Sequence, residues 1–445
     1  MEISRWFKQI TLAKVSIAPL VTFRVFFGAI MFVSILRFWL NGWIEIQFIQ
    51  PILHFKYFGF AWLPEPSAWG YYALFALLAF SALGIALGAF YRWSAVAFFL
   101  AFTYIELIDV SYYLNHYYFV SLVALIMIFL PAHKSLSVDV WRGKTIKTLK
   151  VNALSINILK FQLALVYVFA GIAKLNADWL FEAMPLAIWL PAQDQLPFVG
   201  SLFQYKATAY AFSWAGAIYD LTIPFFLLFG RTRWMAYAAV VVFHLLTWSL
   251  FQIGMFPFIM MGATLIFFSA DFHSWLQRPF VGLNKTSTLD ETSALNGFKW
   301  VHLPVAAFML FQLTFPFRHL LYEGNMFWHE QGYRFGWRVM LMEKAGYAQF
   351  KIEDKDGRTM EVRNADFLTP VQEKMMSTQP DLMIQYAHFL KAYYQSEGIS
   401  AEGVYASVYV TMNGQSSRLF IDSKVNLAEQ IDGWKAKPWI LAHKS

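Results

Sequence analysis

Long apolar runs constrain this sequence more than any other feature. An α-helix needs about 20 apolar residues to cross the hydrocarbon core of a bilayer, and the chain holds roughly nine such runs. They lie near residues 17–40, 68–90, 93–109, 118–131, 155–174, 208–230, 234–251, 255–268 and 300–317. With 58% hydrophobic and 14% charged residues, the composition excludes a soluble globular protein. The sequence therefore predicts a membrane all-α helical bundle of about nine transmembrane helices.

The distribution of positive charge predicts how this bundle is oriented. The loop after the fourth run is the most basic segment, with Lys134, Arg142, Lys144, Lys147 and Lys150. Cytoplasmic loops carry an excess of Lys and Arg, so we place the N-terminus and this loop in the cytoplasm. The net charge of +7 is then a topology signal, and no nucleic-acid partner is predicted. An odd number of spans puts Asn115, His116, Lys174, the segment 251–255 and the C-terminus on the outer face.

Residues 318–445 have the composition of a separate domain that follows the transmembrane domain, residues 1–317. Asp356-Gly357 and Asn413-Gly414 each follow a stretch of strand-forming residues, which is a strong hairpin signal. Residues 381–394 place apolar side chains at helical spacing. We predict a small extracytoplasmic α+β domain. The absence of cysteine excludes disulfides and thiol catalysis anywhere in the chain.

Lys174 ends the fifth apolar run, and Asp178 and Trp179 follow it within about a turn. A lysine at this depth is costly unless it is solvated or used. The side chain can extend to the lipid headgroups. Alternatively, desolvation favours the neutral amine, which can then act as a base. Asp178 can instead pair with the lysine and keep it charged, and a retinal-type Schiff base is a further use of such a residue.

Two histidines and one glycine break lie at predicted membrane positions. Asn115 and His116 stand in an aromatic interfacial stretch, where packing explains a histidine and proton transfer is the alternative. His244 is interpreted as a core residue, or as a haem ligand together with His116. The segment 251–255 is either an ordinary helical hairpin or the wall of a pocket for a flat apolar ligand. Phosphate-loop, zinc-protease and nucleophile-elbow motifs are missing, and no metal site is predicted.

Several motifs together resemble the vitamin K-dependent γ-glutamyl carboxylases, within the wider horizontally transferred transmembrane (HTTM) group. Residues 166–179 read Val-Tyr-x-x-Ala-Gly-x-x-Lys-Leu-x-Ala-Asp-Trp, which is similar to the family's signature around its catalytic base. The other similar segments are Asn115-His116, Ser137-Val-Asp139, Phe251-x-Ile-Gly-Met-Phe256, Gln331-Gly332-Tyr333 with Trp337, Asp356-Gly357-Arg358 and Gln385-Tyr386-Ala387. The resemblance covers nearly the whole chain.

The resemblance implies a coupled reaction. Reduced vitamin K, of the menaquinol or phylloquinol type, is oxidised by oxygen to the epoxide, while a glutamate in a peptide or protein substrate loses its γ-proton and gains carbon dioxide. Lys174 is the implied initiating base, with His116 and Asn115 assisting.

The implied binding residues form two groups. Phe251, Gln252 and Met255 would line the quinone site, and Tyr333 and Trp337 would lie near the glutamate. The implied partners are the glutamate-containing substrate and membrane lipid.

Some features depart from the animal members of the family. Ala173 precedes Lys174 where those enzymes have a second lysine, and Asn176 replaces an acidic residue. The chain ends at Ser445, so the resemblance does not extend to propeptide docking, and we expect a protein of a bacterial inner membrane. The alternatives are a quinol epoxidase without protein carboxylation, a non-catalytic quinone- or lipid-binding protein, and a transporter. A transporter is ranked last because no internal repeat is apparent.

Overall fold

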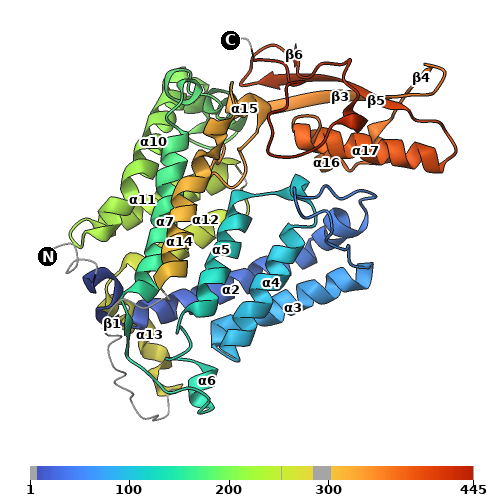
Figure 1. The fold of residues 1–445 in the computed structure, drawn as a ribbon. Coiled ribbons are helices and arrows are strands. Elements are labelled where there is room, and N and C mark those ends of the chain that lie inside the picture. Colours follow the sequence, from blue (N-terminus) through green and yellow to red (C-terminus); the bar gives the residue numbers. More distant parts are fainter. Residues whose placement is uncertain (1–7, 252, 284–301, 444–445) are drawn as a thin grey trace.

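A helical bundle carries a small sheet-containing domain at one end (Figure 1). The structure is a computed structural model that describes residues 8–251, 253–283 and 302–443. The helices of the bundle are α2 (Ala18–Leu40), α3 (Ala68–Leu87), α4 (Tyr91–Glu106), α5 (Asn115–Phe129), α6 (Val138–Trp141), α7 (Leu154–Ala173), α8 (Ala177–Phe181), α9 (Leu186–Trp189), α10 (Lys206–Leu228), α11 (Arg233–Phe251), α12 (Phe256–Thr264), α13 (Ala270–Gln277) and α14 (His302–Thr314). A short ribbon pairs β1 (Lys14–Ser16) with β2 (Lys150–Asn152).

Helices occur near all nine predicted places, but nine transmembrane helices are not confirmed. Among the described residues, α2, α3, α7, α10 and α11 are long and apolar enough to cross a membrane. A sixth span is possible if the segments Phe256–Phe267 and Ala270–Phe280, which are bent by 117°, form one broken span. α4, α5 and α14 have only 16, 15 and 13 residues. The structure therefore supports a membrane protein with five or six candidate spans.

The tightest helix contact in the first half of the bundle depends on a glycine. A Cβ added to Gly28 of α2 would lie 2.4 Å from the backbone nitrogen of Ala86 in α3. Only glycine lets the two backbones approach this closely, as in other membrane helix pairs. α3 itself begins at Ser67, whose side chain caps the helix by accepting a hydrogen bond from the Gly70 amide.

The C-terminal domain contains a four-stranded antiparallel sheet. Its strands are β3 (Lys344–Glu353), β4 (Thr359–Glu361), β5 (Gly403–Met412) and β6 (Arg418–Leu419), in the order β4-β3-β5-β6. The helices are α15 (Met326–His329), α16 (Pro370–Met376) and α17 (Pro380–Ser396). Both predicted hairpins and the predicted helix are confirmed. Alternate residues of β3, namely Ala348, Phe350 and Ile352, are buried against a core that includes Leu382 and Tyr386 of α17.

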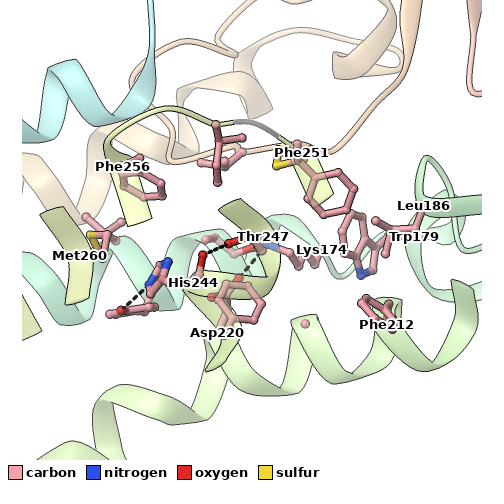
Figure 2. A pocket seen from close by; sticks show the side chains of 18 residues that line it. Lys174, Trp179, Leu186, Phe212, Asp220, His244, Thr247, Phe251, Phe256 and Met260 are labelled. Carbon is pink, nitrogen blue, oxygen red and sulfur yellow. Dashed lines mark hydrogen bonds and ion pairs between the residues drawn. The ribbon is translucent and has the colours of Figure 1, made fainter. Parts of the chain in front are cut away.

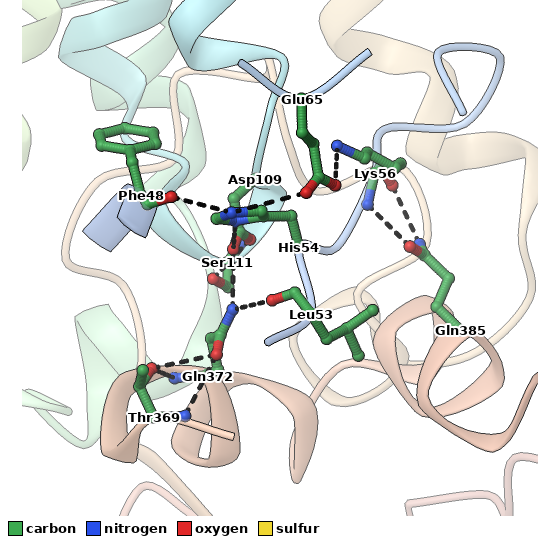
Figure 3. A network of polar contacts seen from close by, with 10 residues as sticks. All are labelled: Phe48, Leu53, His54, Lys56, Glu65, Asp109, Ser111, Thr369, Gln372 and Gln385. Atoms are coloured by element: carbon green, nitrogen blue, oxygen red, sulfur yellow. Dashed lines mark hydrogen bonds and ion pairs between the residues drawn. The ribbon is translucent and has the colours of Figure 1, made fainter. Parts of the chain in front are cut away.

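A buried polar network joins the two parts of the molecule (Figure 3). Gln372 of α16 donates hydrogen bonds from Nε2 to the Leu53 carbonyl at 2.6 Å and to Oδ2 of Asp109 at 2.9 Å. Gln385 of α17 accepts from the Lys56 amide and donates to the Lys56 carbonyl. The loops after α2 and α4 are thereby held against the C-terminal domain. Asp109 also lies six residues before Asn115, so this network restrains the start of α5.

We expect Gln372→Leu to destabilise the protein. The substitution leaves the Leu53 carbonyl without its side-chain donor in a buried interface, and a buried unsatisfied group costs about 1–3 kcal/mol. Thermal unfolding of the detergent-solubilised protein measures the effect as a lower Tm. Gln395→Leu is the matched control, because Gln395 lies at the far end of α17 and its side chain donates a hydrogen bond to the Ala401 carbonyl, away from the bundle. Equal Tm values for the two variants would contradict a docking role for Gln372.

Candidate active site

Lys174 forms a buried ion pair with a carboxylate from another helix (Figure 2). Lys174 is the C-cap residue of α7, and its Nζ lies 2.7 Å from Oδ2 of Asp220 in α10. The two side chains are only 8% and 6% exposed. Nζ also donates to the Ala170 carbonyl at 3.3 Å and lies 5.3 Å from the ring centre of Trp179. The lysine therefore does not extend to the headgroups.

Asp178, which the sequence offered as a partner for Lys174, makes a different contact. Its Oδ2 accepts a hydrogen bond of 2.6 Å from Nδ2 of Asn413, in the turn after β5. The carboxylate on α8 thus ties the helical bundle to the C-terminal sheet. The partner of the lysine is Asp220, which lies within the predicted span 208–230 and was not singled out. An acidic residue inside an apolar run was the signal that could have identified it.

The ion pair opens onto an apolar cavity of about 110 Å³, which we term the lysine cavity. Aromatic and aliphatic side chains from α7, α10, α11 and α12 form most of its wall (Figure 2). They include Val166, Tyr167, Phe212, Phe243, Phe251, Phe256 and Met260. His244 also lines it, with its Nε2 3.1 Å from the Tyr167 hydroxyl. A flat apolar ring in this cavity would have the lysine and the aspartate as its charged neighbours.

A second and larger cavity lies between the bundle and the C-terminal domain. This cavity, which we term the vestibule, has a volume of about 900 Å³. Among its polar and charged lining residues are Tyr113, Asn115, His116, Glu330, Tyr333, Arg334, Arg338, Glu343, Lys344 and Lys374. Asn115 donates from Nδ2 to the Arg338 carbonyl at 2.7 Å and accepts from the Tyr113 hydroxyl at 3.0 Å. The structure thus brings Asn115, His116 and Tyr333 together around one polar space.

Four apolar side chains line both cavities and form the wall between them. They are Ile253, Phe256, Val339 and Met340. The Phe256 ring lies 5.5 Å from the His116 ring and 6.1 Å from the His244 ring, between centres. Phe256 therefore separates the two histidines, and they do not face each other as a pair of haem ligands. Lys174 and His116 lie on opposite sides of one thin wall.

The residues predicted to line a quinone site are divided by this wall. Phe251 lines the lysine cavity, while Met255 lines the vestibule. Gln252 lies outside the described residues. The segment forms a bend in which Gly254 has a φ of +65°, a conformation that favours glycine. The predicted pocket wall at the break is therefore present, but it serves two cavities.

Trp337 does not line the lysine cavity or the vestibule, and its place near the glutamate stays a prediction. Its indole is 1% exposed and stacks on Tyr118 with ring centres 5.0 Å apart. The Trp337 indole packs against Tyr118 of α5, and this contact positions the chain segment that follows Trp337. That segment contains Arg338, Val339 and Met340, which do line the vestibule.

The chain from Glu330 to Met340 is strained where it borders the vestibule. Glu330, Phe335, Trp337 and Met340 all have a positive φ, between 55° and 59°. Such backbone conformations are unfavourable for residues with a side chain and persist only when the surroundings impose them. They cluster at ligand-binding and active sites, so this segment, which we term the strap, is a candidate part of the site.

Ion pairs to the C-terminal domain hold the strap in place. Nζ of Lys344 lies 2.8 Å from Oε1 of Glu330, with both side chains less than 10% exposed. Arg334 pairs with Asp381 at the start of α17. Burial alone would raise the pKa of Asp381, but the Arg334 guanidinium outweighs it and holds that pKa below its usual value.

Arg338 is the strap cation whose charge is not matched by a carboxylate among the described residues. It donates to the Pro316 carbonyl at 3.2 Å, and its Nη2 lies 2.6 Å from Nδ1 of His319. Burial lowers the pKa of Arg338 to about 10. The sequence did not single out Arg334, Arg338 or Lys344, because their pairing depends on folding across the strap. Because carboxylates pair with Arg334 and Lys344, Arg338 is the strap residue that adds unpaired positive charge to the vestibule.

Comparison with known protein families covers most of the chain. Residues 13–272 match the family model of the HTTM domain. Residues 298–445 match the model described as the lumenal domain of vitamin K-dependent gamma-carboxylase. No solved structure matches this chain. The first match contains Lys174 and Asp220, and the second contains the strap and the sheet.

Proposed function

The chain belongs to the vitamin K-dependent γ-carboxylase family, and on that premise we propose that it couples oxidation of reduced vitamin K to carboxylation of peptidyl glutamate. The observation that carries the proposal is the pair of adjoining cavities. One is apolar and holds a buried lysine, the other is polar and cationic, and four side chains separate them. A reaction with one apolar and one anionic substrate requires this kind of arrangement.

The lysine cavity fits a naphthoquinone ring. Its lining is mostly aromatic and aliphatic, its charged groups are Lys174 and Asp220, and its neutral polar groups are those of Tyr167, His244 and Thr247. Phe251 and Phe256 would contact the ring faces, with Lys174 placed to take a proton from a ring hydroxyl. Reduced vitamin K, when bound, would supply the reaction with oxygen that generates a base strong enough to attack a glutamate γ-proton. The protein's own part is to bind the ring, exclude water and accept the hydroxyl proton at the Lys174 end of the cavity.

The vestibule suits a glutamate side chain and the peptide that carries it. Its positive charge attracts a carboxylate, and its volume accommodates neighbouring residues of the substrate. Tyr333, Asn115 and His116 line the same space and are the groups we assign to orienting the glutamate and assisting carboxylation. The apolar wall would place the glutamate close to the quinone while keeping bulk water away from the reacting atoms.

Orientation in the membrane follows from the same proposal. The match to a lumenal domain indicates an extracytoplasmic C-terminal domain. α6, which lies in the basic segment 134–150, is at the opposite end of the bundle from the sheet (Figure 1). We therefore place this segment and the N-terminus in the cytoplasm, with the vestibule facing outward.

The test uses purified protein in detergent with phylloquinol, oxygen, labelled carbon dioxide and a glutamate-containing peptide. We expect phylloquinone epoxide together with label in the peptide, and no label in a peptide with glutamine in place of glutamate. Epoxide without labelled peptide would identify a quinol epoxidase that carboxylates no protein. The absence of both products would reject the proposed function.

A further inference from the structure

We propose that Asp220 shares the role of proton acceptor with Lys174, so that the two residues take up and hold protons as one unit. This inference rests on the proposed function, because it assigns the proton to be taken to a ligand hydroxyl in the lysine cavity. The family's signature and the sequence both point to the lysine alone. Asp220 comes from α10, and its role follows from its distance of 2.7 Å to Nζ and from the burial of both side chains.

Close packing of α7 against α10 fixes this contact. A Cβ added to Gly171, one turn before Lys174, would lie 2.8 Å from the backbone nitrogen of Leu221, the residue after Asp220. The two backbones therefore touch at the position of the ion pair. This packing fixes the distance between the two backbones at which the side chains of Lys174 and Asp220 pair. The Lys174–Asp220 ion pair therefore lies inside a tight helix interface and not on the surface.

Among the described residues that line the lysine cavity, Lys174 and Asp220 are the only charged pair. Tyr167 on α7, Tyr219 on α10 and His244 on α11 are the titratable groups beside it, and Trp179 on α8 contacts Nζ. The strap contributes only Val339 and Met340 to this cavity. No second carboxylate or cation in the described chain forms an ion pair with either residue.

Counting protons shows why the pair must act together. The pair can exist as an ammonium beside a carboxylate or as an amine beside a carboxylic acid. Both forms hold one titratable proton and have a net charge of zero. When a ligand O–H bond breaks, its electron pair stays on the ligand oxygen and the proton joins the pair. Both starting forms then give the same product, an ammonium beside a carboxylic acid. The proton affinity therefore belongs to the pair and not to the lysine alone.

A shared proton acceptor avoids a difficulty that arises if Lys174 acts alone. A lysine held charged by a carboxylate has no lone pair and cannot act as a base. The carboxylate of the same pair can still accept the proton, and the resulting net charge of +1 balances the negative charge left on the ligand. In an apolar cavity this balance is worth much more than in water. Asp220 is thus the residue on which the added proton is expected to be found.

Infrared spectroscopy of the ligand-free protein tests the inference without any turnover. The protein is labelled with ¹³C-aspartate, and the carbonyl stretch of protonated carboxyl groups is followed during acid titration. We expect one such band to be lost in Asp220→Asn and retained in Asp178→Asn, the matched carboxylate outside the cavity. Asp220→Glu should replace this labelled band by an unlabelled one, which provides the assignment if Asp220→Asn does not fold. Anaerobic addition of phylloquinol at constant pH should raise the same band.

The pH dependence of epoxide formation is the second test. With Asp220→Asn, we expect the rate at neutral pH to fall by about 10²-fold or more, because the pair can no longer take up a second proton. Asp220→Glu should recover part of the rate, and Asp178→Asn should match the native profile. An unchanged profile in Asp220→Asn, or a band that persists in this variant, would overturn the inference. If native protein makes no epoxide, the proposed function fails, while the ligand-free titration still decides whether the buried Asp220 carboxylate takes up a proton.

Discussion

Lys174→Ala is expected to lower the rate of epoxide formation by about 10²–10⁴-fold, the contribution typical of a positioned general base. The variant removes Nζ, which is the group that faces both the apolar cavity and Asp220. Binding of the quinone should be affected much less, because aromatic side chains provide most of the cavity wall. The measurement is epoxide formed per minute by the purified protein at saturating phylloquinol.

Two further variants make this result interpretable. Lys206→Ala is the control, since Lys206 begins α10 on the surface and its side chain is 63% exposed. It should keep the native rate. Lys174→Ala also leaves the Asp220 carboxyl buried without its partner, which can impair folding. The double variant Lys174→Met/Asp220→Asn removes both charges and should fold but remain inactive. Full activity in either Lys174 variant would reject the lysine as the base.

Lys344→Met is expected to cause the largest loss of stability, about 3–5 kcal/mol, because it leaves one member of a buried ion pair uncompensated. Nζ of Lys344 contacts Oε1 of Glu330 and donates to the carbonyls of Trp328 and Thr378 at 2.6 and 3.0 Å. It therefore connects the strap, α15 and the end of α16 to the first residue of β3. Urea unfolding in detergent, followed by tryptophan fluorescence, measures the change.

The double variant Lys344→Met/Glu330→Gln separates the buried charge from the lost packing. Removing both charges should recover much of the stability, as is seen when buried ion pairs are replaced together. Lys351→Met is the control on the same strand, because Lys351 pairs with Glu361 at an exposed site and should change stability by less than about 1 kcal/mol. A loss in Lys351→Met as large as that in Lys344→Met would show that burial of the pair is not the cause.

Local sequence patterns predicted most elements but not how far each helix extends. Runs of apolar residues correctly indicated α2, α3, α7, α10 and α11. The run near 255–268 bends sharply after Phe267, and composition alone does not show where a helix turns. The Asp356-Gly357 and Asn413-Gly414 turns were correctly placed. Pairing of β3 with β5 was not predictable, since some 50 residues separate these strands.

The site was predicted where one residue carries an unusual local signal. Lys174 is conspicuous because it is a charge at the end of an apolar helix, and the glycine break marked the wall between the cavities. Asp220 and the strap cations have meaning only through partners distant in sequence, such as Glu330 with Lys344 and Arg334 with Asp381. A motif pointed to Trp337, but its burial against Tyr118 could not be predicted from the sequence.

The hydrophobic core of the sheet domain includes residues from the bundle. Phe55 and Tyr57, from the loop after α2, and Val110, after α4, are buried in the same cluster as Phe350 and Leu382. This sharing sets an order of assembly during biosynthesis. The sheet residues are translated after both loops, and their core is complete only once these loops are in place. A fragment starting at residue 318 would lack part of its own interior, so correct placement of the early loops is a precondition for folding the domain that closes the vestibule.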